Sequence, residues 1–194
     1  MKKFWQITFA AIMLLGCSGD NVDTKLEPTQ PKIDSFFPVT SFIKGQMNLF
    51  DSLQVTPLQI TVIKEKNDSV WLKKLQLKQT LQSFLTPEIN ETGLTKYFKQ
   101  TKFHDQTLNA ITFTYDPVGK LPDSLPLRHW DVYIDPETGN VMKVYIVKGM
   151  SRQGRSYTEQ LTWQTGQSAK ISSFLNKPDG SMELIKDMIV KWDF

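Results

Sequence analysis

Hydrophobic residues follow a helical period near the start of the chain and a strand period over most of its second half. Over residues 38–53 they recur every three or four positions, which predicts an amphipathic helix capped by Asp34 or Ser35. Over residues 108–192 apolar and polar positions alternate in short runs separated by turn residues, a pattern typical of antiparallel strands. The pattern as a whole predicts an α+β fold.

Between these regions the period changes twice. Alternation over residues 58–72 predicts a β-hairpin with its turn at Asn67-Asp68. Helical spacing returns over residues 77–85, and the segment Thr86-Pro87-Glu88 is typical of the cap and first turn of a second short helix, running towards Phe98.

Six strands are predicted in succession after this helical region, joined by short turns and by a loop at residues 149–154. They cover residues 108–115, 130–134, 141–148, 156–163, 169–174 and 182–192. Such a succession predicts a mostly antiparallel, meander-like sheet of about six strands plus the hairpin, with the N-terminal helices packed on one face. The outline is similar to periplasmic lipoprotein carriers, with a curved sheet and a helical lid, or to a cystatin-like helix on a sheet.

The first seventeen residues have the build of a secretory signal. Lys2 and Lys3 precede a short apolar run that ends in Leu14-Leu15-Gly16-Cys17. The run is too short for a spanning helix, which needs about 20 apolar residues. Its ending resembles the lipobox of bacterial lipoproteins, at which signal peptidase II cleaves. The resemblance implies that residues 1–16 are a signal peptide and that Cys17 becomes the lipidated first residue of a membrane-tethered protein.

The same resemblance implies a location in the bacterial cell envelope. Ser18, directly after the cysteine, is similar to the residue found in lipoproteins sent to the outer membrane. Residues 17–32 contain few apolar side chains, so we expect a lipidated cysteine followed by a flexible tether. Residues 33–194 are expected to form a single α+β globular domain.

The charge of the chain is nearly balanced once the signal is set aside. The whole sequence carries a formal net charge of +3, and removal of Lys2 and Lys3 leaves +1. Nucleic acid is therefore not predicted as a partner. Cys17 is the only cysteine, so the fold is expected to be stable without a disulfide, and acylation would remove its thiol from redox, zinc or nucleophilic chemistry.

The candidate chemistry centres on His129 and Asp131. In a strand these residues share the face opposite Trp130, so their side chains can meet. The sequence has no His-x-x-x-His spacing, no Gly-x-Ser-x-Gly and no glycine-rich loop between a strand and a helix. No catalytic residue, cofactor or metal is therefore predicted, and a solvated polar face is the simpler explanation of the pair.

Tryptophans are candidates for exposed aromatic binding surfaces. Trp130, Trp163 and Trp192 share strand parity with apolar residues and are predicted to lie in the core. Trp71 instead falls opposite Val70, so it is the tryptophan to check for exposure, although we expect it to pack beneath a helix.

A further surface candidate is the loop that carries Lys148, Arg152 and Arg155. It would suit an anionic ligand or a lipid headgroup, and a solvated hairpin loop is the simpler explanation.

These features favour a non-enzymatic, lipid-anchored envelope protein that binds an envelope protein, a lipid or a glycan. One alternative is an envelope hydrolase or metal-assisted enzyme that uses the His129/Asp131 face. Another is a structural subunit whose sheet edge pairs with a larger complex.

Overall fold

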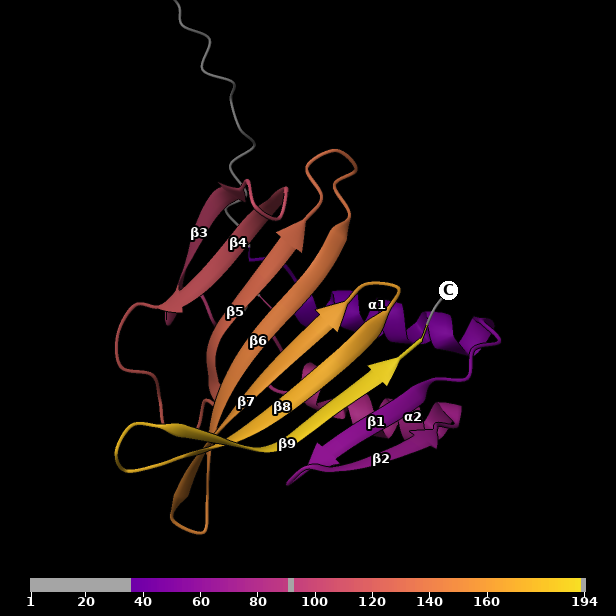
Figure 1. Cartoon of the computed structure of the whole chain (residues 1–194). Coiled ribbons are helices and arrows are strands. Elements are labelled where there is room, and N and C mark those ends of the chain that lie inside the picture. Colours follow the sequence, from indigo (N-terminus) through magenta and orange to yellow (C-terminus); the bar gives the residue numbers. More distant parts are fainter. Residues whose placement is uncertain (1–35, 91–92, 193–194) are drawn as a thin grey trace, which may run out of the picture. The chain divides into compact units, whose positions relative to one another are not determined.

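The computed structural model describes residues 36–90 and 93–192 of the chain (Figure 1). Residues Asp34–Phe194 form one compact unit. Its helices are α1 (Val39–Ser52), α2 (Lys74–Thr80) and the 3₁₀ helix η1 (Leu81–Leu85). Its strands are β1 (Leu58–Ile63), β2 (Lys66–Trp71), β3 (Phe98–Asp105), β4 (Ala110–Pro117), β5 (Leu127–Ile134), β6 (Val141–Arg152), β7 (Arg155–Gln164), β8 (Ser168–Asn176) and β9 (Met182–Lys191).

All nine strands belong to one sheet, with the order β2-β1-β9-β8-β7-β6-β5-β4-β3. Every neighbouring pair is antiparallel. The described part is therefore α+β, as predicted, but the sheet has nine strands, which corrects the expectation of about six plus a hairpin. The six predicted strands correspond to the meander β4 to β9, and the predicted hairpin joins this meander because β1 pairs with β9.

The short helix that was expected to run from Thr86 towards Phe98 is absent from the described residues, and the ninth strand, β3, covers a stretch for which no element was predicted. Residues 93–97 form turns instead, and β3 begins at Phe98. Its only other apolar residue is Phe103, so the strand lacks the alternation that marks a half-buried strand. Because β3 is an edge strand with most of its side chains exposed, it does not need such a pattern.

Two details of the hairpin and of α1 also differ from expectation. The hairpin turns at Lys64 and Glu65, which have φ angles of 47° and 67°, so Asn67 and Asp68 lie inside β2. Positive φ at both central residues is the geometry of a two-residue hairpin turn. Helix α1 begins at Val39 with Pro38 in the N-cap position and without a side-chain cap; the predicted caps at positions 34 and 35 lie outside the described residues.

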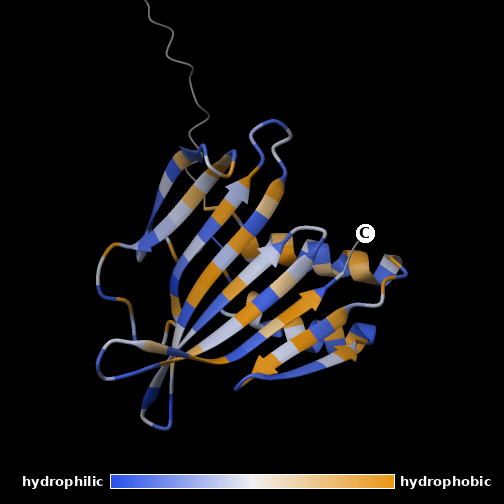
Figure 2. Ribbon diagram, viewed as in Figure 1, coloured by the Kyte–Doolittle hydropathy of each residue, from blue (hydrophilic) through white to orange (hydrophobic). Residues whose placement is uncertain are grey.

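The helices cover one face of the sheet (Figure 1). We call this the covered face and the other the open face. Hydrophobic and polar positions alternate along much of the meander (Figure 2), and its buried apolar residues form one core with those of the helices. Trp130 stacks on Tyr115 with 4.5 Å between ring centroids, and Phe84 of η1 meets Trp163 edge-on at 5.6 Å. Trp192 lies 5.2 Å from Trp163. The three tryptophans predicted to be core are thus buried, and aromatic rings fill the space between helices and sheet.

Loss of the Phe84 ring should destabilise the domain by about 3–5 kcal/mol, because a fully buried phenylalanine leaves a cavity when it is replaced by alanine. The matched substitution Phe103→Ala removes a ring that is 49% exposed and should change stability by no more than about 0.5 kcal/mol. Urea unfolding of both variants measures the difference. Equal losses would contradict the assignment of the core.

Candidate functional site

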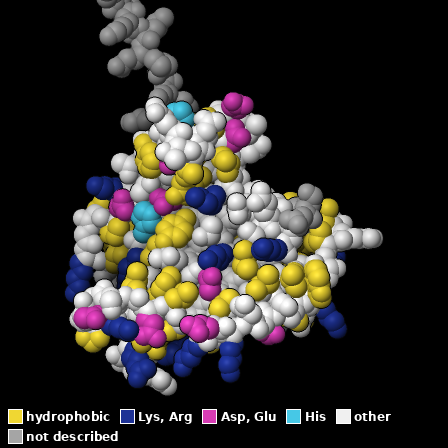
Figure 3. Space-filling model, viewed as in Figure 1, with side chains coloured by type: hydrophobic (Ala, Val, Ile, Leu, Met, Phe, Trp, Pro, Cys, Tyr) yellow, Lys and Arg dark blue, Asp and Glu magenta, His cyan; other side chains and the backbone are white. Residues whose placement is uncertain are grey.

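A histidine held between two carboxylates lies on the open face over β4 and β5. His129 Nε2 is 2.9 Å from Asp131 Oδ2, and His129 Nδ1 is 2.9 Å from Asp116 Oδ1. Thr114 donates a 2.7 Å hydrogen bond from its hydroxyl to Asp131 Oδ1. Figure 3 views this face and shows a histidine flanked by acidic side chains. We call Asp116, His129 and Asp131 the histidine cluster.

The antiparallel register explains how the cluster is assembled. Thr114 of β4 is paired with Asp131 of β5, and Tyr115 with Trp130. Side chains alternate along each strand, so the polar residues Thr114 and Asp116 leave β4 on the same side as His129 and Asp131 leave β5. The predicted meeting of His129 and Asp131 is correct. Asp116 and Thr114 were not foreseen, although they occupy the outward positions on either side of Tyr115.

The carboxylates stabilise the protonated form of the histidine. The hydrogen bond to Asp131, followed by the charges of both acids, raises the pKa of His129 above its ordinary value of 6.5 against the opposing effect of burial. A raised pKa means that the folded chain binds this proton more tightly than the unfolded chain. The contribution of His129 to the free energy of unfolding is therefore complete at pH values below the pKa that this residue has in the unfolded chain. It is lost as the pH rises through the pKa of His129 in the folded chain.

The same geometry limits the chemistry of the histidine. A general base needs a ring nitrogen within reach of the proton that it removes. Both nitrogens of His129 already bind carboxylate oxygens, and a protonated ring has no lone pair to accept a proton. The cluster therefore suits a fixed arrangement of charges, in which a protonated His129 offsets one of its two carboxylate partners, better than a proton-transfer site.

Tyrosines border the cluster. The Tyr145 ring lies 6.3 Å from His129, and Lys143 Nζ lies 3.8 Å above the Tyr133 ring. Burial and the nearby Asp131 charge raise the pKa of Tyr133 to about 12, so its hydroxyl stays protonated at neutral pH. The open face here presents aromatic rings, hydroxyl groups and a cation.

Lys148 ends the predicted strand 141–148 and was also counted with the basic loop that follows; it lies in β6 and is buried on the covered face. Its ammonium donates hydrogen bonds to the backbone carbonyls of Ser83 and Thr86 and thereby ties β6 to η1. Burial lowers the pKa of Lys148 to about 8, and the charge of Glu159 opposes that shift. Lys148 marks the point at which the helices stop covering the sheet.

The predicted loop at residues 149–154 is mostly strand. β6 continues to Arg152, β7 begins at Arg155, and only Gln153 and Gly154 form the turn, with φ angles of 53° and 71°. Arg152 and Arg155 are therefore neighbours across a hairpin and do not form a flexible basic cluster with Lys148.

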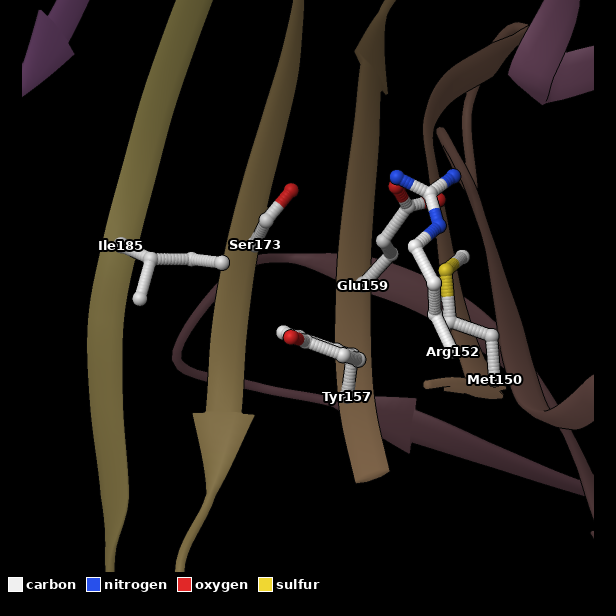
Figure 4. A pocket seen from close by; sticks show the side chains of 6 residues that line it. All are labelled: Met150, Arg152, Tyr157, Glu159, Ser173 and Ile185. Atoms are coloured by element: carbon white, nitrogen blue, oxygen red, sulfur yellow. The ribbon is translucent and has the colours of Figure 1, made fainter. Parts of the chain in front are cut away.

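A pocket of about 220 Å³ lies beside this hairpin (Figure 4). It combines the charges of Arg152 and Glu159 with apolar side chains, and its lining residues project from four adjacent strands. They are Met150, Arg152, Tyr157, Glu159, Ser173 and Ile185. Arg155 lines a different pocket, of about 570 Å³, with Pro178.

Trp71 is 63% exposed, so the expectation that it packs beneath a helix is wrong. The register pairs Trp71 with Leu58, and Leu58 with Lys191 of β9. Gln59, not Leu58, faces the helices, since Gln59 Oε1 accepts a 3.4 Å hydrogen bond from the Thr80 hydroxyl of α2. Leu58, Ile60 and Trp71 therefore point to the open face, whereas the buried apolar positions of the meander point to the helices.

Three observations concern metal binding, membrane-spanning helices and the predicted signal. Within residues 36–90 and 93–192, no group of three or more His, Cys, Asp or Glu side chains is arranged to hold a metal ion. No helix in that part of the chain is long and apolar enough to cross a membrane. Cys17 and the other residues of the predicted signal lie outside the described residues.

Comparison of the chain with protein-family models, curated proteins and solved structures finds no match.

The position of the histidine proton can be measured directly. In a His104→Gln background His129 is the only histidine, and its ring protons should titrate in NMR spectra with a pKa above 6.5. Asp131→Asn should lower that pKa more than Asp116→Asn, because the Asp131 hydrogen bond is the larger cause. A wild-type pKa at or below 6.5 would contradict the two-carboxylate geometry.

Proposed function

We propose that this protein is a lipid-anchored component of the bacterial cell envelope, at the outer membrane, that binds a partner through the open face of its sheet. The observation that carries the proposal is the one-sided covering of the sheet. Helices bury one face of the meander, while the other displays His129, Tyr133 and Tyr145 without any covering element among the described residues.

The composition of this face supports a binding role. Aromatic rings that keep a polar group are enriched at protein interfaces, because they bury area while holding a hydrogen-bonding group in place. The meander supplies such rings beside threonine hydroxyls and the histidine cluster. An envelope protein or a glycan fits this surface. Carriage of a lipid between helices and sheet fits less well, because rings already fill that space.

An envelope hydrolase based on His129 and Asp131 is the weaker proposal. Its general base would have to give up a carboxylate partner before it could accept a proton. The cluster also lies on a sheet face, whereas active sites favour concave pockets, and His129 lines none of the pockets beside Arg152, Arg155 or Lys64.

A structural role through edge pairing has one observation in its favour. Strand β2 ends the sheet, and all six of its residues are exposed. Its outer backbone groups are available to another strand. Lys66 and Asp68 on this edge are, however, the kind of charged residues that discourage such pairing.

The anchor is tested by replacing the cysteine. Cys17→Ser should move the protein from the membrane to the soluble fraction and prevent the mass increase expected of acylation. Blotting of fractionated cells and intact mass spectrometry measure both effects. A variant that stays in the membrane with the wild-type mass would overturn the lipobox interpretation, and Ser18→Ala serves as the control that keeps the anchor.

The open face is tested by site-specific photo-crosslinking in cells. A photoreactive residue at Thr162, on the open side of β7, should give discrete adducts, whereas one at Lys44, exposed on α1, should give few. Gels and mass spectrometry of the adducts provide the measurement. Equal yields at both positions would contradict a binding role for the open face.

A further inference from the structure

The corner where β2 meets α2 combines exposed apolar groups with lysines. The segment Trp71-Leu72-Lys73-Lys74-Leu75 leaves the edge of the sheet and enters the helix. Trp71 is 63% exposed and Leu75 is 70% exposed, while Leu72 between them is buried. Two large apolar side chains are thus held in solvent by a fixed backbone.

The apolar surface continues across the open face of the hairpin. By register, Trp71 lies next to Leu58, while Ile60 lies next to Ile189 of β9. Figure 3 shows hydrophobic side chains gathered over β9 and β1. A contiguous patch of this kind marks an interaction surface rather than a scatter of single residues.

The basic side chains around this corner indicate the charge of the surface that the corner would contact. Four lysines lie at or beside the corner: Lys73, Lys74 and Lys78 at the start of α2 and along it, and Lys191, which is paired with Leu58. Lys78 is paired with Asp51 at 2.8 Å, and Lys74 donates to the Asp51 carbonyl. Among the described residues, no ion pair neutralises Lys73 or Lys191. Tryptophan and lysine together are the residues that favour the interface of an anionic bilayer.

We propose that the corner Trp71–Leu75 is a membrane-contact site that inserts Trp71 and Leu75 into the headgroup region of a phospholipid bilayer containing anionic lipid. The proposal rests on the lipid anchor proposed above, because that anchor brings the bilayer close. Only 19 positions separate Cys17 from Phe36, so the chain between them spans at most roughly 65 Å. Within that distance a weak patch is sufficient, since the lipid supplies most of the membrane affinity.

Contact at this corner would fix the orientation of an anchored domain. Trp71 lies at one edge of the sheet and the histidine cluster lies beside the other, on β4 and β5. A domain held by the β2 edge would keep the histidine cluster away from the lipid and accessible to a partner. The membrane contact and the partner site would then occupy separate parts of the same sheet.

Vesicle binding of the chain from Ser18 to Phe194 tests the proposal without the acylated cysteine. This chain retains the whole compact unit, and Trp71 is exposed while Trp130, Trp163 and Trp192 are buried. With vesicles of phosphatidylglycerol and phosphatidylcholine, we expect sedimentation with the lipid, a blue shift of the fluorescence and quenching by brominated lipid. Binding should weaken in vesicles of phosphatidylcholine alone and at high salt.

Variants locate the contact. Trp71→Ala should weaken binding by about tenfold and abolish the quenching, whereas Phe103→Ala, on the opposite edge strand, should leave both unchanged. Absence of vesicle binding, or equal effects of the two variants, would overturn the membrane contact. Trp71-dependent self-association in sedimentation velocity without lipid would overturn it in favour of a second copy. Each of these results leaves the separate Cys17→Ser test of the anchor unaffected.

Discussion

Burial of a single face of the sheet is the constraint on which the rest of the structure depends. The helices lie between residues 39 and 85. Phe50 of α1 contacts Trp163 and Trp192, Phe84 of η1 contacts Trp163, and Leu77 of α2 is buried in the same core. Because this interior is filled by side chains, a ligand has to bind on the outside. The exposed surfaces are the open face, the two edge strands and the part of the covered face that lies beyond the helices.

Lys148 defines where that covering ends. Its ammonium replaces water around two carbonyl groups at the end of η1, which would otherwise be poorly satisfied next to the sheet. On one side of it the strands carry leucine, isoleucine and tryptophan towards the helices. On the other side Arg152 and Tyr157 take the corresponding positions and line a pocket together with Glu159, which is paired with Lys148. One buried cation therefore separates the core from a surface with different properties.

The alternation of side chains along a strand was enough to predict which residues share a face of the sheet. It placed Trp130 in the core and brought His129 to Asp131, because alternate side chains of a strand must share a face. It could not supply Asp116, since that requires the register between β4 and β5, and it missed β3, whose edge position demands no apolar pattern. It also placed Trp71 wrongly, because Gln59 and Thr61 of the hairpin face the helices while Leu58, Ile60 and Trp71 face the open side.

The pairing of β1 with β9 has a consequence for how the chain can fold. The partners Leu58 and Lys191 are far apart in sequence, whereas the pairs within the meander β4 to β9 all join strands that follow one another along the chain. The meander can therefore assemble from local contacts, but the hairpin can join the sheet only after the last strand is available, at the entropic cost of closing a long loop. Until then β9 is an unprotected edge, so the final step of folding is also the step that removes a site for aggregation.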